Sequence, residues 1–219
     1  MKTKRILLII LMFLPLALTL IALQFLPDQI PAHYDINNQV NRWGSKYEIL
    51  IFPIITIIFG FIMMLITKFA AKQEKNGHNN ENIVLLLSIL SLILFNAMTL
   101  YFLYADLHSI ENLSTLSFDI SQLMFAILGT IMIIMGNIMP KARLNSAIGL
   151  RTVWSMKNST TWKKSQRFGG ITFIITGLLI IIISLLTKGF PCVALSLGLI
   201  ILSLPIDIIY TYKVAKKYS

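Results

Sequence analysis

The sequence predicts an all-α integral membrane protein with six transmembrane helices and both termini in the cytoplasm. Three observations lead to this prediction: the composition, the number of long apolar segments and the placement of the basic residues. Of the 219 residues, 56% are hydrophobic and 13% are charged, which is about half the charged share of a soluble domain. One soluble core of this size cannot bury so many apolar residues.

Six apolar segments are long enough to cross a bilayer, whose core takes roughly 20 residues per helix. They cover residues 6–26, 48–67, 83–104, 118–139, 169–187 and 192–210. The first follows a basic start but is too long for a signal peptide, and no small-residue cleavage site follows it. We therefore expect a retained helix, in which Pro15 introduces a bend that neighbouring helices tolerate.

The basic residues fall on alternate connections of this arrangement. Sixteen of the nineteen Lys and Arg lie on one side: Lys2, Lys4, Arg5, Lys68, Lys72, Lys75, Lys141, Arg143, Arg151, Lys157, Lys163, Lys164, Arg167, Lys213, Lys216 and Lys217. Only Arg42, Lys46 and Lys188 lie on the other. This bias places the richer side in the cytoplasm. Topology and attraction to anionic lipid then account for much of the net charge of +10, and no nucleic-acid partner is expected.

The chain divides into three predicted regions. Residues 1–82 form an N-terminal two-helix region with an external loop over 27–47, and residues 83–139 form a middle two-helix region. Residues 140–219 form a C-terminal region, with a cytoplasmic loop over 140–168 followed by two helices.

Small residues recur at intervals of seven in two of the segments. Gly129 and Gly136 share a face of the fourth, and Gly170, Gly177 and Ser184 share a face of the fifth. Because small residues let helices approach closely in lipid, we expect the fourth and fifth segments to pack together.

Polar residues are few within the predicted membrane segments, and two of them stand out. Asn96 falls in the middle of the third, and Asp207 falls near the cytoplasmic end of the sixth, after Pro205. An intramembrane acid is a functional candidate. The alternative is that Asp207 reaches the interface or pairs with a basic residue of the 140–168 loop. Two such groups do not make a proton relay, which weighs against a pump.

The sequence shows no pattern of catalytic chemistry. His33 and His108 are expected outside and His78 inside, so the three cannot form one site. Asp106 and His108 are too few for a metal site, and the single Cys192 forms no internal disulfide. Zinc-protease, hydrolase-elbow and phosphate-loop motifs are all missing. We therefore expect a protein that is not an enzyme and uses no cofactor or metal.

The external loop contains an unusual number of aromatic and polar side chains. His33, Tyr34, Trp43 and Lys46 lie within fourteen residues of one another. Trp43 and Lys46 fit an anchor at the membrane interface. Such a surface also suits a peptide ligand, and both interpretations stay open.

The loop over 140–168 is too long for a plain turn between helices. Asn158 predicts the N-cap of a short helix over 159–168. Trp154 and Trp162 are not expected to share one helix, and either could lie at the lipid headgroups. Arg151, two residues after Gly149, could pair with Asp207 or with a partner's carboxylate.

Two sets of motifs resemble the SdpI family of bacterial membrane proteins. P-x-H-Y from Pro31 and W-G-S-K from Trp43 resemble the N-terminal domain of unknown function in that family. N-x-x-I-G-L-R-T-x-W-S from Asn145 and W-K-K-x-x-R-F-G-G from Trp162 resemble its C-terminal signature. The chain departs from the pattern at Val153, where a Pro is expected, and at residues 165–166, where a Thr-His-like pair is expected.

The resemblance implies a six-span bacterial plasma-membrane immunity protein that protects its cell from a secreted, membrane-acting peptide toxin. It also implies a sensor that draws a cytoplasmic autorepressor to the membrane. Other classes left open are a sensor without an immunity role and a small transporter component. The candidate binding residues are His33, Trp43, Lys46, Asn145, Gly149, Arg151, Trp154, Trp162 and Arg167.

Overall fold

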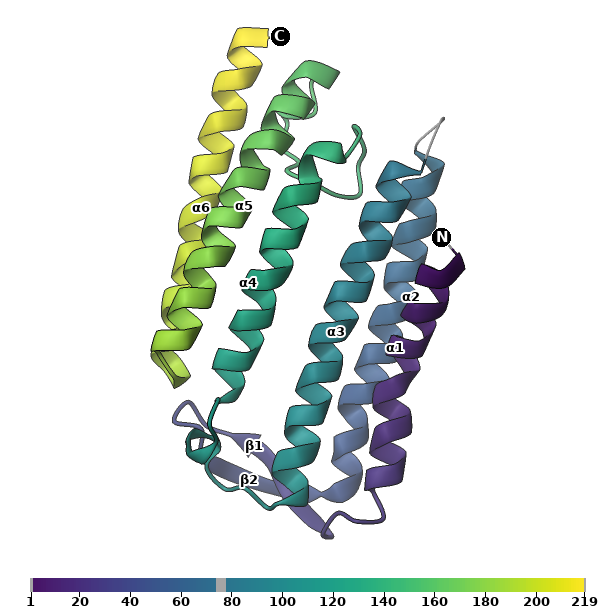
Figure 1. Cartoon of the computed structure of the whole chain (residues 1–219), viewed down its shortest axis with the longest axis vertical. Helices are drawn as coiled ribbons and strands as arrows, with labels where there is room; N and C mark the ends of the chain where they lie inside the picture. Colours follow the sequence, from purple (N-terminus) through teal and green to yellow (C-terminus); the bar gives the residue numbers. More distant parts are fainter. Residues whose placement is uncertain (1, 74–77, 219) are drawn as a thin grey trace.

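Six long helices run side by side in the computed structural model, which describes residues 2–73 and 78–218 (Figure 1). They are α1 Lys2–Ala22, α2 Ile51–Lys72, α3 Asn79–Leu107, α4 Ile120–Ile138, α5 Ser159–Leu186 and α6 Gly189–Tyr218. Each is long and apolar enough to cross a membrane, so the predicted six-helix membrane fold is confirmed. Lys75, counted among the cytoplasmic charges, lies outside the described residues.

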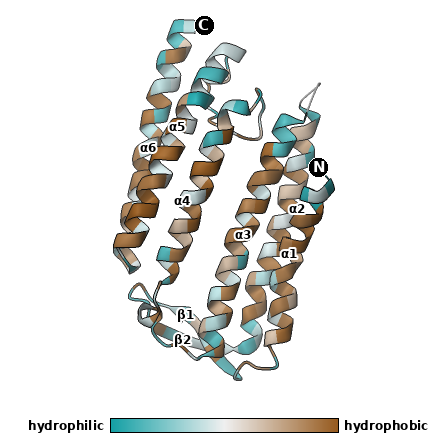
Figure 2. Ribbon diagram, viewed as in Figure 1, coloured by the Kyte–Doolittle hydropathy of each residue, from teal (hydrophilic) through white to brown (hydrophobic). Residues whose placement is uncertain are grey.

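The helices form two groups of three. Helices α1 and α2 pack on α3, α5 packs on both α4 and α6, and the groups meet along α3 and α4. Large apolar side chains are exposed on the outward faces, among them Ile10, Phe61 and Ile201. Figure 2 shows hydrophobic residues over the middle of the bundle and hydrophilic residues towards its two ends. This distribution fits a surface that faces lipid between two aqueous layers.

Helices α4 and α5 approach each other at reciprocal glycine contacts. A Cβ added to Gly129 would lie 2.6 Å from the carbonyl oxygen of Gly177, and one added to Gly136 would lie 2.5 Å from that of Gly170. Side chains at these positions would therefore force the two backbones apart. The predicted packing of these segments is confirmed, and this pair is the most extensively packed in the bundle.

The proline in α1 is compensated by a polar residue of α3. Pro15 has no N–H and leaves the carbonyl of Leu11 without its usual helical donor. Asn96 donates from its side-chain nitrogen to that carbonyl at 2.8 Å and to the carbonyl of Leu92 at 2.7 Å. The intramembrane asparagine predicted from sequence therefore ties α3 to α1 at the point where α1 lacks a bond.

The expected short helix over 159–168 and the separate span over 169–187 are one helix, α5. Asn158 is its N-cap, as predicted, and accepts hydrogen bonds from the amides of Thr160 and Thr161. Nothing interrupts the helix at Gly169–Gly170, because these glycines serve close packing rather than a break. Helix α5 therefore begins nearly three turns before the predicted span.

Asp207 occupies neither position of the alternative interpretation, the interface or an ion pair with the 140–168 loop. Its residue is 2% exposed, so it does not reach the interface. Thr172 of α5 is the polar neighbour of its carboxylate, and in the described part of the chain no ion pair joins Asp207 to a basic residue. Asp207 of α6 is therefore buried against α5.

The external loop folds into an antiparallel hairpin, which sequence analysis did not predict. Strand β1 Gln29–Tyr34 pairs with β2 Val40–Ser45, with Pro31 opposite Trp43 and an irregular register around His33. The hairpin lies across the helix ends on the side away from both termini (Figure 1). It is followed by the short helix η1 Lys46–Leu50, which leads into α2.

We expect Gly129→Ala to destabilise the bundle by about 1–3 kcal/mol, since the added methyl group meets the backbone of α5. Thermal unfolding of the purified protein in detergent measures this. The matched control is Gly198→Ala on α6, where an added Cβ has nothing within 4 Å. Equal melting temperatures for the two variants would contradict the glycine-mediated contact.

Candidate functional site

A cavity of about 460 Å³ lies beneath the hairpin, between β1 and the adjoining ends of α2, α3 and α4. Its apolar lining includes Ile30 of β1, Phe52 of α2, Phe102 of α3 and Leu113 of the α3–α4 connection. The polar lining comprises His33, Tyr34, Asp35, Asn38, Arg42, Glu48 and Asp106. The cavity is therefore an apolar space with a small number of ionisable groups at its edge, as is usual for ligand sites.

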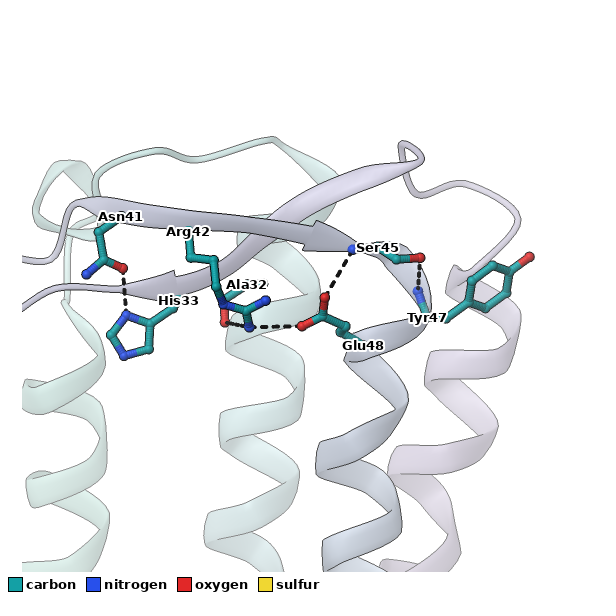
Figure 3. A network of polar contacts seen from close by, with 7 residues as sticks. All are labelled: Ala32, His33, Asn41, Arg42, Ser45, Tyr47 and Glu48. Carbon is teal, nitrogen blue, oxygen red and sulfur yellow. Dashed lines mark hydrogen bonds and ion pairs between the residues drawn. The ribbon is translucent and has the colours of Figure 1, made fainter.

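An ion pair fixes the edge of the cavity next to α2 (Figure 3). Arg42 of β2 donates to the Glu48 carboxylate at 2.9 Å and to the Ala32 carbonyl at 3.3 Å. Its hydrogen bond with Glu48 raises the pKa of Arg42 above its ordinary value. Glu48 also accepts from the amide of Ser45 at 3.2 Å, which completes the N-terminal cap of η1. The positive charge of Arg42 is thus already paired.

The base of the hairpin is closed by a second ion pair. Lys46 donates to the Asp28 carboxylate at 2.9 Å, and this hydrogen bond holds the pKa of Asp28 below its usual value. The amide of Lys46 also donates to the carbonyl of Asp28 at 3.1 Å. Lys46 therefore fixes the start and the end of the hairpin relative to each other.

The tip of the hairpin is tied to the α4–α6 side of the bundle by Asp119, the N-cap of α4. Its carboxylate accepts from Asn38 at 3.2 Å, from Ser121 at 2.6 Å and from the Gln122 amide at 2.8 Å. It also accepts from the amide of Gly189, where α6 begins. Burial by itself would raise the pKa of Asp119, but these hydrogen bonds outweigh it and hold the pKa below its usual value.

Asp106 differs from the other acids at this end, because one of its carboxylate oxygens lacks a partner. The residue is 3% exposed, and its Oδ1 accepts no hydrogen bond from the part of the protein that the structure describes. Tyr34 donates instead to the carbonyl of Ile110 at 2.8 Å. Burial, followed by the charge of Asp106, raises the pKa of Tyr34. An unbonded buried carboxylate is costly, so Asp106 is poorly explained by a structural role.

The structure separates the three candidates of the external loop. His33 lines the cavity, and its Nδ1 lies 2.6 Å from the side-chain oxygen of Asn41. Trp43 is 44% exposed on β2 and does not line the cavity. Lys46 is held by Asp28. Only His33 of the three can contact a ligand in the cavity, while Trp43 is free to contact the interface or a larger partner.

The opposite end of the bundle is closed by residues 140–158, which form a folded segment rather than an open loop. The side chain of Asn145 accepts from the amides of Ala147 and Ile148 at 2.7 and 2.8 Å and so shapes a turn. Gly149 has a φ of 97°, and an added Cβ there would lie 2.5 Å from the side-chain oxygen of Gln166. The position therefore requires glycine.

Gln166 of α5 holds this turn from below. Its side-chain oxygen accepts from the Leu150 amide at 2.9 Å, and its nitrogen donates to the Leu150 carbonyl at 3.0 Å. Gln73, after α2, makes two hydrogen bonds of 2.7 Å with Ser146. Asn80 of α3 accepts from the amide of Arg143 at 3.0 Å. The segment therefore links both helix groups.

The interfacial interpretation of Trp162 is wrong. The residue is 2% exposed, and its indole nitrogen donates to the Ala142 carbonyl at 2.7 Å. The reason is that α5 is continuous, so the side of this helix that carries Trp162 packs against the 140–158 segment. Trp154 does lie outside that helix, as expected, and packs edge-on against Tyr212 of α6 with ring centroids 5.4 Å apart.

Arg151 and Arg167 are exposed. Arg151 does not pair with Asp207, and the ion pairs found among residues 2–73 and 78–218 involve neither arginine. The structure thus brings Asn145 and Gly149 into the folded segment, joins Trp162 of α5 to it through Ala142, and leaves the two arginines exposed. A partner's carboxylate remains the predicted ligand of Arg151.

Sequence analysis missed several residues of the cavity. Arg42, Glu48, Phe52 and Phe102 become neighbours only because the hairpin folds over the helix ends. Asp106 did have a sequence signal: an acid in the last turn of a helix faces the negative end of the helix dipole, which is unfavourable. His108, once considered with it, instead lies 2.8 Å from the Tyr104 carbonyl.

Comparisons with known proteins find matches to the sequence at both ends of the bundle. Residues 10–57 match a domain of unknown function, DUF1648, and residues 141–211 match the SdpI/YfhL protein family. The chain is 28% identical over 216 residues to Immunity protein SdpI of Bacillus subtilis (strain 168), covering 99% of this chain and 98% of that protein. Residues 141–211 of the chain thus carry the SdpI/YfhL family domain. No solved structure matches it.

The matched segments include both candidate regions. The DUF1648 match includes the hairpin and the start of α2, and the SdpI match includes residues 141–158, all of α5 and most of α6. The two departures noted in the sequence have different settings. Val153 is 81% exposed, so its position accepts many side chains. Gln166 is buried, and its side-chain oxygen accepts a hydrogen bond from the amide of Leu150, next to Gly149.

Trp162 and Arg151 should differ sharply in their effect on stability. We expect Trp162→Ala to cost about 3–5 kcal/mol, because it removes a buried ring. Arg151→Ala should change stability by less than about 0.5 kcal/mol, because the side chain is exposed. Thermal unfolding in detergent compares them, and a large loss in Arg151→Ala would contradict the surface position.

The stability of the hairpin end should depend on pH through Asp119. Its folded-state pKa is below the ordinary 3.8, so its stabilising contribution is present above that value and is lost as the pH falls through the lowered one. Melting temperatures between about pH 5 and pH 3 should fall more steeply for the natural chain than for Asp119→Asn. The control Glu111→Gln removes an exposed acid of the same end, and an equal flattening in that variant would count against Asp119.

Proposed function

We propose that this chain protects the cell that makes it from a secreted, membrane-acting peptide. The observation that supports this most directly is the alignment with Immunity protein SdpI, which extends over nearly the whole of both chains. A shared local motif would support only a common domain, whereas end-to-end similarity includes both the hairpin end and the 140–158 segment. The six apolar helices fit a protein that lies in the membrane, which is where such a toxin acts.

The same proposal places the chain in the bacterial plasma membrane with both termini in the cytoplasm. The bias of Lys and Arg towards the terminal end of the bundle supports this orientation. The hairpin and its cavity then face the outside, where a secreted peptide arrives. His33, Trp43 and Lys46 belong to this outer surface, in which His33 contacts the peptide and Lys46 keeps the hairpin in place.

A second candidate function is sensing, in which peptide binding draws a cytoplasmic autorepressor to the membrane. The exposed Arg151, Val153 and Arg167 on the terminal end of the bundle favour it, because they form a cationic surface with an exposed apolar side chain. In this candidate Asn145, Gly149 and Trp162 keep that surface in shape. Trp154, which packs on α6, connects it to the C-terminal helix.

Survival of a toxin-sensitive bacterium that expresses the chain tests the proposal. We expect protection against at least one peptide in a panel of membrane-active peptides, and Arg151→Ala should reduce it if the terminal end takes part. Lys141→Ala is the matched control, since it removes an exposed cation from the same end. Membrane abundance must be equal among the strains.

Two outcomes would count against immunity. Survival no better than that of the empty strain against every peptide would contradict protection, and a soluble partner that co-purifies only in the presence of peptide would then favour sensing alone. Peptide-independent flux of small solutes would favour a transporter component.

A further inference from the structure

The charge around the hairpin-end cavity is opposite in sign to the charge of the whole protein. The chain has a net charge of +10, yet the lining has three acids, Asp35, Glu48 and Asp106, against one arginine, Arg42, and one histidine, His33. Glu48 and Arg42 neutralise each other at 2.9 Å. Asp35 accepts hydrogen bonds from the amides of Asn37 and Gln39, which shape the hairpin turn. Asp106 is the remaining acid without such a function.

The position of Asp106 is unfavourable for a residue that only supports the fold. It lies in the last turn of α3, where the backbone carbonyls already present partial negative charge. It is nine-tenths buried or more, it lines the cavity, and its Oδ1 has no partner within the described structure. A neutral Asn would fit the same space at lower electrostatic cost. The carboxylate therefore suits a function that needs a negative charge.

The remaining lining of the cavity is apolar, which indicates the kind of group that a bound cation would be attached to. Phe52 and Phe102 supply aromatic rings, and Ile30 and Leu113 supply aliphatic surface. Aromatic faces attract cations as well as apolar groups. The cavity is thus matched to a group that is cationic at one end and apolar along its length.

We propose that the hairpin-end cavity binds a primary ammonium or guanidinium group attached to an apolar chain, with Asp106 as its counter-charge. The inference rests on the proposed function, so this group is assigned to the peptide toxin, as its amino terminus or as a Lys or Arg side chain. A cavity of about 460 Å³ holds only a small part of a peptide, so most of the ligand stays outside, and the exposed Trp43 lies on β2 next to Arg42 of the lining.

Binding of a small probe tests the chemistry without a toxin. The full chain is purified in phosphatidylcholine nanodiscs, and isothermal titration calorimetry compares phenethylammonium with its neutral analogue 2-phenylethanol. We expect the ammonium to bind about tenfold more tightly or better, as close charge pairs in buried interfaces do. Asp106→Asn should lose this preference while its melting temperature stays the same or rises.

The control Glu111→Gln removes an exposed acid from the same end and should keep the preference for ammonium. Equal binding of the two probes to the natural chain, or an ammonium preference that survives in Asp106→Asn, would overturn the proposal. Competition by phosphatidylethanolamine in the discs would assign the ammonium to a lipid headgroup and overturn its assignment to a peptide.

The survival assay separates this inference from the proposed function. Asp106→Asn should lose protection at equal membrane abundance, and Glu111→Gln should retain it. Full protection by Asp106→Asn would overturn the role of Asp106 while leaving immunity intact. Ammonium binding that depends on Asp106, in a chain that protects against no peptide, would overturn immunity while leaving the site.

Discussion

The carboxylate of Asp119 is the contact on which the hairpin end depends. It caps α4, binds the hairpin tip through Asn38 and holds the start of α6 through the amide of Gly189. Three segments far apart in the chain therefore meet at one side chain. The hairpin is also joined to the α3–α4 connection, through Tyr34 and the backbone of Val40, but Asp119 is the side chain that ties it to the starts of α4 and α6.

Two acids at the same end show how partners distinguish a structural carboxylate from one available for binding. Asp119 is buried with donors from a side-chain amide, a hydroxyl and backbone N–H groups, so its charge is stabilised by the fold. Asp106 is equally buried, but its Oδ1 has no donor in the described part of the molecule. Sites that bind ligands commonly keep groups whose charge the free protein does not satisfy, at some cost in stability. The two ends of the bundle differ in the same way, since the 140–158 segment is densely hydrogen-bonded and the hairpin encloses a cavity.

The helices could be predicted from sequence because their signals are local. Apolar length gave six spans, and glycines at intervals of seven identified the α4–α5 contact at Gly129 and Gly136. The hairpin escaped prediction, because Pro31 and an irregular register obscure the alternation of a strand. The continuity of α5 escaped because its first ten residues are polar and basic, although a helix can extend beyond a bilayer. The burial of Trp162, and of Asp207 away from any cation, escaped for a related reason: burial depends on neighbouring helices, which no local pattern reveals.

Photo-crosslinking would test most directly whether the peptide is bound at the hairpin end. A benzoylphenylalanine replaces Phe52, which lines the cavity, or Phe168, which stacks on Tyr210 at the other end with centroids 3.8 Å apart. Both substitutions exchange one aromatic ring for another, and a peptide against which the chain protects is then added to cells. The account predicts a crosslinked product from position 52 and none from position 168. A product from position 168 alone would contradict it.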